Sequence, residues 1–341
     1  MMTWQMTLRM VVPVLLLAAV LPARAARREV VGYFWVPEKD TSPYWTLADH
    51  SDALTAIAPT WLAYDPDGHL LNTADPRVLR FAKGRGLKVT PLVANQGFKP
   101  ETARPVFADD VAVKKNVAAL LKAVTDLGAD GINVDIEGVA PADRALYNNF
   151  IAALCDAFHA RRLIVTAAIP AKTADNPTGA WAGFGDYAFL GKHLDQVQLM
   201  CYDEHWSGGE AGPIASLPWV RKVLEYATTV IPREKIVMGI PFYGYDWPET
   251  GSASEVTPLK GERLQKQAGE EARWDDVART TSVRYTDADG RKRTAYFETA
   301  RSLKERLDLA RAFKVAGVAI WRLGDETPDF WPHLKRYREG R

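Results

Sequence analysis

Cysteine is nearly absent from the sequence, and no familiar metal-binding pattern occurs in it. Only Cys155 and Cys201 are present in 341 residues, one in a helix-like run and one in a strand-like run. Each stands where an apolar residue would face helix–sheet packing, so we expect two buried free thiols and no disulfide. The six histidines show no HExxH spacing, and CxxC does not occur. We therefore expect neither a metal nor another cofactor.

An excess of either charge is also lacking. The chain has 43 Lys and Arg against 42 Asp and Glu, for a formal net charge of +1. This balance does not indicate a nucleic-acid-binding surface or a polybasic membrane patch. The hydrophobic content of 47% and charged content of 25% are typical of a globular protein and exclude a disordered one. The length suits one large α/β barrel or two ordinary domains, and we expect a monomer.

Long apolar runs are missing beyond the N-terminus. The first 25 residues place Arg9 before an apolar run at 10–21 and end in a small-x-small pattern, Ala23 to Ala25. This arrangement is typical of a signal peptide cleaved after Ala25, which leaves residues 26–341 as the mature domain. An uncleaved anchor is the alternative, but the run is short for a bilayer and no second one follows. We expect an exported protein, periplasmic or secreted, without stable membrane insertion.

Short apolar runs alternate regularly with stretches of helical period. The runs typical of strands are 28–36, 56–64, 87–95, 131–137, 162–170, 196–203, 235–244 and 315–323. The helical stretches between them include 111–127, 141–161, 218–230 and 300–313. Eight such units predict an α/β protein with a (β/α)8 TIM barrel, and Val/Ile/Leu-rich runs are typical of strands buried on both faces. A doubly wound open sheet is the alternative, but the first turn, "YFWVPEKDTSP", lacks the glycines expected there.

One connection is too long for a simple loop. More than fifty residues separate the seventh strand from the helix that starts near Ala300. They include a helical piece at 260–272 and two strand-like runs that flank "DADGRK", where Asp-Gly is a hairpin signal. We predict a small α+β insertion at about 246–298, between strand 7 and helix 7. It should project from the carboxyl ends of the strands, where barrel active sites form.

The fourth strand carries acidic groups on one face. In "DGINVDIEG", Asn133, Asp135 and Glu137 alternate with three branched aliphatic residues. Because strand side chains alternate, the aliphatic face should pack on the helices and the polar face should point into the barrel. Carboxylates about 7 Å apart in a partly desolvated site raise the pKa of at least one of them, which suits a leaving-group donor. The alternative is that both are solvated or paired with Arg.

These motifs resemble those of glycoside hydrolase family 18, the chitinases and related β-N-acetylglucosaminidases. "DGINVDIE" is similar to the family signature D-G-x-D-x-D-x-E, with Asn133 where Asp is commonest, as in the chitobiase and spore-cortex-lytic branches. "LMCYDEHWSGG" (199–209) resembles the family's M-x-Y-D strand. "IPREKIVMGIPFYGYDW" (231–247) and "VAIWRLGDE" (318–326) resemble the cortex-fragment-lytic N-acetylglucosaminidases. The resemblance covers essentially all of the mature chain.

The resemblance implies substrate-assisted retaining catalysis, without a nucleophilic carboxylate from the protein. Glu137 would protonate the glycosidic oxygen, and the 2-acetamido oxygen of the substrate would attack the anomeric carbon. Asp135 would orient the acetamido group, and Tyr202 would donate a hydrogen bond to its carbonyl oxygen. Further expected substrate contacts are Asn133, Asp203, Met200, Trp321, Tyr33, Asn95 and Tyr243, with Trp321 as the floor of the reacting-sugar subsite. Four more aromatic residues are expected either to line the cleft or to pack: Trp35, Trp206, Tyr245 and Trp247.

The expected function is an exported glycosidase that cleaves β-1,4 bonds beside N-acetylglucosamine. Its partner would be an N-acetylglucosamine-containing glycan, either peptidoglycan fragments or chitin oligosaccharides. The cortex-lytic likeness favours peptidoglycan, and "VANQG" in place of the S-x-G-G of many chitinases weakens a transfer of chitinase specificity. A non-catalytic lectin on the same fold is the alternative, although lectins typically lose the acid that Glu137 supplies. A metal-dependent deacetylase acting on the same polymers is disfavoured, because the sequence shows no His/Asp set of metal ligands.

Overall fold

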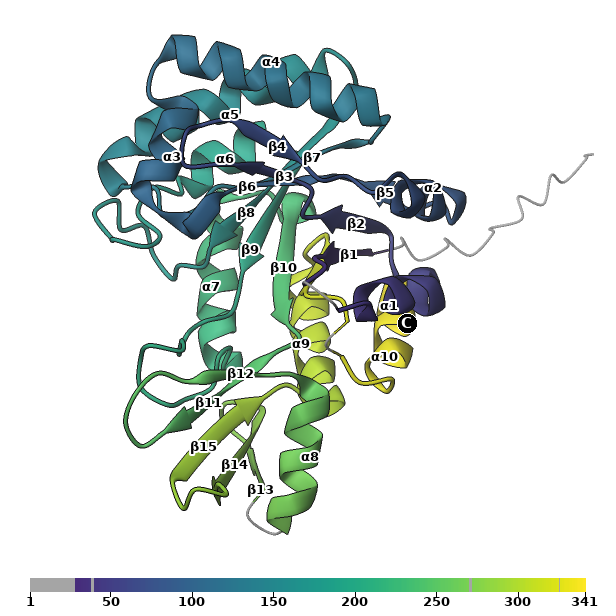
Figure 1. Cartoon of the computed structure of the whole chain (residues 1–341), viewed down its shortest axis with the longest axis vertical. Helices are drawn as coiled ribbons and strands as arrows, with labels where there is room; N and C mark the ends of the chain where they lie inside the picture. The colour runs from purple at the N-terminus through teal and green to yellow at the C-terminus, as the bar shows by residue number, and fades with distance from the viewer. Residues whose placement is uncertain (1–27, 38–39, 270–271, 325) are drawn as a thin grey trace, which may run out of the picture.

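The structure is a computed structural model that describes residues 28–37, 40–269, 272–324 and 326–341 (Figure 1). The predicted signal peptide, residues 1–25, lies outside the described residues. Within them, no helix combines the length and the apolar character that crossing a membrane requires.

Parallel strands form a closed barrel. Its strands are β1 (Glu29–Phe34), β2 (Ala56–Pro59) with β3 (Leu62–Tyr64), β5 (Lys88–Val89) with β6 (Leu92–Asn95), β7 (Gly131–Asp135), β8 (Ile164–Pro170), β9 (Gln196–Met200), β10 (Ile236–Pro241) and β16 (Gly317–Trp321). Each strand pairs in parallel with its neighbours, and β16 pairs with β1 to close the ring. The prediction of a (β/α)8 barrel is confirmed.

The second and third barrel strands are each interrupted. Pro59 ends β2 before β3 begins, and Pro91 separates β5 from β6. Because proline has no backbone N–H, it cannot donate to a strand ladder. The ladder nevertheless continues on both sides of each break, since β2 pairs with β5 and β3 pairs with β6. The short strand β4 (Leu70–Asn72) pairs antiparallel with β3 outside the ring.

Helices surround the barrel. They are α1 (Ser42–His50), α2 (Pro76–Gly84), α3 (Pro100–Phe107), α4 (Asp110–Leu127), α5 (Arg144–His159), α6 (Tyr187–His193), α7 (Leu217–Val230), α9 (Ala300–Phe313) and α10 (Phe330–Arg338). Local sequence fixes their ends: the Asp109 side chain accepts a hydrogen bond from the Ala112 N–H at the start of α4, and Gly128 ends it in the left-handed conformation. The helix predicted at 141–161 is instead a short 3-10 turn, Pro141–Asp143, followed by α5.

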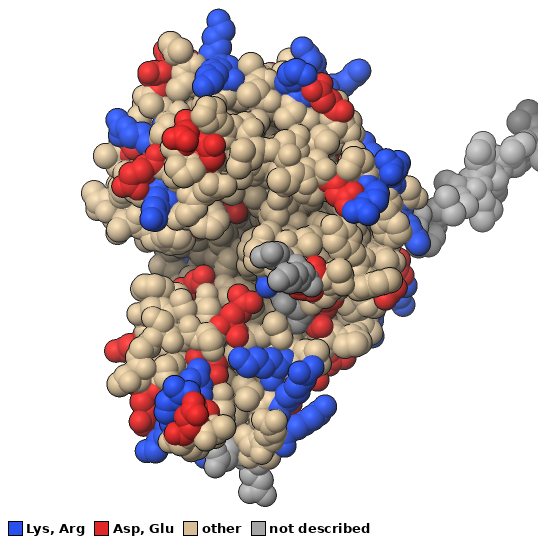
Figure 2. Space-filling model, in the orientation of Figure 1, with Lys and Arg blue, Asp and Glu red and all other residues tan. Residues whose placement is uncertain are grey.

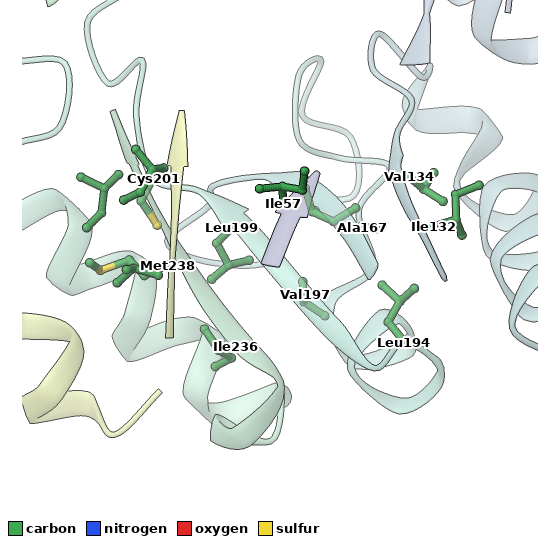
Figure 3. Close-up of a cluster of buried hydrophobic side chains, with 14 of the residues drawn as sticks. Ile57, Ile132, Val134, Ala167, Leu194, Val197, Leu199, Cys201, Ile236 and Met238 are labelled. Carbon is green, nitrogen blue, oxygen red and sulfur yellow. The ribbon is translucent and has the colours of Figure 1, made fainter. Parts of the chain in front are cut away.

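The main core lies between the barrel and its helices (Figure 3). Ile132 and Val134 are fully buried there, as the alternation in the fourth strand predicts. Cys155 and Cys201 are buried in the same core and are free, which confirms the prediction of unpaired thiols. Inside the barrel a second, smaller core includes small residues such as Ala56, together with buried polar side chains. The barrel interior is therefore only partly apolar.

The segment between β10 and α9 forms an antiparallel sheet with one helix, at the lower end of the molecule in Figure 1. In sheet order its strands are β12 (Ser254–Val256), β11 (Gly244–Pro248), β15 (Lys292–Phe297), β14 (Thr280–Thr286) and β13 (Ala272–Asp275), with helix α8 (Pro258–Ala268). β14 and β15 form a hairpin at Asp287–Gly290, where the sequence has its Asp-Gly signal. The predicted helix at 260–272 is too long, because Ala272 already begins β13.

A buried arginine joins this insertion to the barrel. Arg306 of α9 is 1% exposed and donates a hydrogen bond to the Glu298 carboxylate at 2.8 Å. The same guanidinium donates to the carbonyl of Arg279, at the start of the β14 region, and to that of Ala215, just before α7. Since a buried cation is stable only when paired and hydrogen-bonded, these contacts fix the insertion to the barrel wall.

Candidate active site

A cavity of about 330 Å³ opens at the carboxyl ends of the barrel strands, on the side of the insertion. Figure 2 shows the surface hollowed between the barrel and the insertion. The predicted site residues that line the cavity are Tyr33, Asp135, Glu137, Met200, Tyr202, Asp203, Tyr243 and Trp321. They come from β1, β7, β9, β16 and the segments that follow strands β7, β9 and β10, so the closed barrel brings them together from distant parts of the sequence.

Two carboxyl groups, one at the end of the fourth barrel strand and one two residues after it, share this cavity. Asp135 is the last residue of β7 and is 5% exposed, and burial raises the pKa of its carboxyl group. The pKa of Glu137 is raised first by burial and then by the negative charges of Asp135 and Asp203. Desolvation and like charge both oppose ionisation, so Glu137 is the group that keeps a proton near neutral pH. A protonated acid in a cleft can donate to a leaving group.

Tyr202 faces these carboxyl groups from the segment after β9. Burial raises the pKa of its phenol well above the ordinary value, and the negative charge of nearby carboxyl groups, Asp135 among them, acts in the same direction. The hydroxyl therefore keeps its proton and is a hydrogen-bond donor at neutral pH. Tyr33 is held beside it, because its hydroxyl donates to Gln198 Oε1 at 2.6 Å.

Aromatic rings form the floor and one wall of the cavity. The Tyr33 and Trp321 rings meet edge to face, with centroids 5.3 Å apart. On the wall nearest the insertion, the Tyr243 hydroxyl donates to Asp203 Oδ1 at 2.6 Å. Asp203 has a φ of +61°, an uncommon conformation for a residue with a side chain, and such strain is concentrated at functional sites. Flat rings beside polar groups suit the C–H faces and hydroxyls of a sugar.

Two predicted substrate contacts lie beneath the cavity and do not line it. Asn95 is 1% exposed, and its side chain binds the backbone of Glu137: Oδ1 accepts from the Glu137 N–H at 2.9 Å and Nδ2 donates to the Glu137 carbonyl at 3.0 Å. Asn133 is fully buried and donates to Thr166 Oγ1 and Gln198 Oε1. Neither side chain lines the cavity in this structure: Asn95 holds the segment that carries Glu137, and Asn133 is hydrogen-bonded inside the barrel below Asp135.

Three aromatic residues of the cavity were missed from the sequence: Phe98, Trp181 and Trp219. Phe98 and Trp181 are 46% and 57% exposed, so their rings are open to a ligand. Both lie in segments that directly follow the barrel strands β6 and β8. Because such segments form the active-site face of a barrel, their position in the sequence could have indicated them as cavity residues. Among the undecided aromatics, Tyr245 lines the cavity, whereas Trp247 is 3% exposed and lies outside it.

One group of described residues has donor atoms close enough to hold a cation. Asp65, Asp67 and His69 lie in the turn between β3 and β4, away from the cavity lining. The Asp65 carboxylate already accepts hydrogen bonds from the backbone N–H groups of Asp67 and His69. The position of these three side chains is therefore explained by the hydrogen bonds of the turn.

A closed barrel with a buried carboxyl pair in an aromatic cavity at the carboxyl ends of its strands is the architecture of a glycosidase. The chain belongs to the glycosyl hydrolases family 18, whose family model matches residues 29–326. It is 31% identical over 306 residues to the Bacillus subtilis glycosylase YvbX, covering 87% of this chain and 88% of that protein. It is 33% identical over 242 residues to the B. subtilis cortical fragment-lytic enzyme, covering 70% of this chain and 56% of that protein.

Solved structures agree with this assignment. The chitinase from Chromobacterium violaceum superposes with a TM-score of 0.85 at 29% identity, covering 91% of this chain and 98% of that chain. The Bacillus megaterium spore cortex-lytic enzyme SleL superposes with a TM-score of 0.84 at 25% identity, covering 92% of this chain and 74% of that chain.

Proposed function

We propose that this glycosidase hydrolyses β-1,4 bonds beside N-acetylglucosamine with help from the substrate's own acetamido group. The observation that carries the proposal is the buried pair Asp135 and Glu137 in one cavity with Tyr202. Glu137, whose pKa is raised, protonates the glycosidic oxygen. The acetamido oxygen attacks the anomeric carbon to form an oxazolinium ion, and Glu137 then removes a proton from the incoming water.

Asp135 and Tyr202 have complementary roles in this scheme. Asp135 accepts a hydrogen bond from the acetamido N–H and stabilises the positive charge of the oxazolinium ion. Tyr202, which keeps its proton, donates to the acetamido oxygen. Both interactions strengthen as charge develops, and so they favour the transition state over the bound substrate.

Names among the relatives support a substrate that contains N-acetylglucosamine. They include cortical fragment-lytic enzymes of Bacillus and the di-N-acetylchitobiase of Rattus norvegicus. We favour peptidoglycan fragments over chitin oligosaccharides.

We further propose that residues 1–25 direct export of the enzyme to such a substrate. N-terminal sequencing of the exported chain tests this proposal, and Ala26 is the expected first residue. A different first residue would contradict cleavage after Ala25.

Product analysis tests the proposed substrate. Purified enzyme is incubated separately with muropeptides and with chitotetraose, and the released sugars are identified by mass spectrometry. We expect muropeptide fragments with new reducing ends. Hydrolysis of chitotetraose alone would overturn the preference for peptidoglycan, and binding of both without release would indicate a lectin.

Replacing Asn133 by Asp is expected to move the acidic limb of the kcat–pH profile to lower pH, by roughly one unit, with activity retained. Asp135 must be ionised in the proposed mechanism, but burial raises its pKa and Asn133 cannot take up its proton. A second carboxyl group at position 133 can share that proton, so the pair loses its first proton at lower pH. Superimposable profiles for wild type and N133D would refute this explanation.

A further inference from the structure

A second hollow, of about 790 Å³, lies beside the catalytic cavity. One side is the sheet of the insertion and the other is the segment 208–211. The two spaces adjoin at Tyr245, which lines the catalytic cavity, and Trp247, which lines the second hollow; their ring centroids are 5.6 Å apart. A glycan bound at the catalytic carboxyl groups can therefore extend onto the insertion.

The strand register shows which side chains face this hollow. Trp247 is opposite Thr294, and Thr294 is opposite Arg284, so these three side chains form one row across the sheet. Lys292, two residues from Thr294, lies on the same face. Helix α8 packs on the other face, over a small core that includes Phe297. The face bearing Arg284 is thus the one left open toward the hollow.

The polar groups on this face are mainly hydrogen-bond donors. The Trp247 Nε1 is buried and has no hydrogen-bond partner among the described residues. Arg284 is exposed and forms no ion pair with any carboxylate that the structure describes. Lys292 is 3.8 Å from Glu249, a pair in which both side chains are largely exposed and which is therefore weak. A buried donor without a partner costs free energy unless a ligand or water supplies an acceptor.

Among the described residues that border the hollow, Arg284 and Lys292 are the cations without a strong ion pair, and only Arg284 lies in the row with Trp247 and Thr294. Arg293 also borders the hollow, but its guanidinium is bound to the Asp246 carboxylate at 2.9 Å. Glu210 and Glu249 are exposed at the border and disfavour a ligand that places negative charge near them. A suitable ligand therefore places its hydrogen-bond acceptors and its negative charge next to the row formed by Trp247, Thr294 and Arg284.

We propose that this hollow binds a carboxylate-bearing part of the glycan substrate, with Arg284 as its charged contact. A guanidinium binds a carboxylate through two parallel hydrogen bonds, which gives both affinity and orientation. The carboxylate belongs either to a lactyl ether on the sugar or to a peptide attached to it. The inference rests on the proposed function and deepens it, because a neutral chitin chain has no carboxylate for Arg284 to bind.

The test compares Arg284→Gln with wild type on three substrates: chitotetraose, an N-acetylglucosaminyl-N-acetylmuramic acid tetrasaccharide with free lactyl carboxylates, and the same tetrasaccharide carrying peptide stems. The measurement is the ratio of kcat/KM for each acidic substrate to kcat/KM for chitotetraose. We expect this ratio to fall about tenfold in R284Q. A stem is attached through the lactyl carboxyl group, so the stemmed substrate has only peptide carboxylates. A fall only with the unstemmed substrate therefore indicates the lactyl carboxylate, a fall only with stems indicates the peptide, and a fall with both indicates that Arg284 binds either carboxylate.

Arg263→Gln is the matched control, because Arg263 is exposed on α8 and its replacement removes the same charge from the opposite side of the insertion. It should leave the ratio unchanged. An equal loss on all substrates in R284Q would indicate a structural role and overturn the proposal, as would an unchanged ratio. If wild type hydrolyses nothing, calorimetric binding of the acidic tetrasaccharides to E137Q, with and without R284Q, separates failure of the proposed chemistry from failure of this site.

Discussion

Glu137→Gln is expected to lower kcat by roughly 10³- to 10⁴-fold, the contribution of a well-placed general acid and base. Glutamine keeps the shape and the backbone bonds to Asn95 but cannot transfer a proton. Because the amide side chain would still fill the same place in the cavity, KM should change little. Release of reducing ends from N-acetylglucosamine oligomers measures the effect.

The control for this substitution is Glu225→Gln, which makes the same chemical change on the exposed surface of α7. It should retain full activity, and neither variant should alter the thermal unfolding midpoint. Activity within tenfold of wild type in E137Q would show that another group supplies the proton, and the proposed mechanism would then be abandoned.

Asp135→Asn should lower kcat by roughly 10²- to 10³-fold, because it removes a negative charge aimed at the developing oxazolinium ion. It should also change the pH profile. The Asp135 charge is one of the causes that raise the pKa of Glu137, so its removal lowers that pKa. Activity requires Glu137 to be protonated, and is lost as pH rises through its pKa; the basic limb of kcat should therefore move to lower pH in D135N.

Steady-state kinetics across pH on a single N-acetylglucosamine oligomer would measure both effects. A basic limb that stays in place, together with reduced kcat, would mean that Asp135 acts without electrostatic contact with Glu137. An unchanged kcat would remove Asp135 from the proposed mechanism altogether.

The sequence predicts those features of the fold that follow from the regular geometry of strands and helices. Alternation in "DGINVDIEG" predicts which side chains enter the barrel, because a strand has a period of two. Eight strand–helix units predict the closed ring, and strand ends predict where Tyr33, Tyr202 and Trp321 converge. These inferences need only local geometry and a known architecture.

Contacts between neighbouring strands and loops do not follow from any periodic pattern in the sequence. Asn95 ends β6, a position that suggests a cleft residue, but its amide is the right length to bind the backbone of Glu137, just after the next strand. Phe98 and Trp181 depend on the paths of the segments after β6 and β8, which no periodic pattern sets. The insertion likewise shows its hairpin in the sequence, whereas the order of its strands depends on pairing between distant segments.

The two thiols in the main core bear on the conditions under which the chain can fold. Burial raises the pKa of Cys155 and of Cys201 to about 12, so almost none of either is thiolate at neutral pH. Oxidants and disulfide exchange act on the thiolate, which makes both sulfurs inert once the core has formed. The fold therefore contains no disulfide, and we expect it to have the same stability in oxidising and in reducing surroundings.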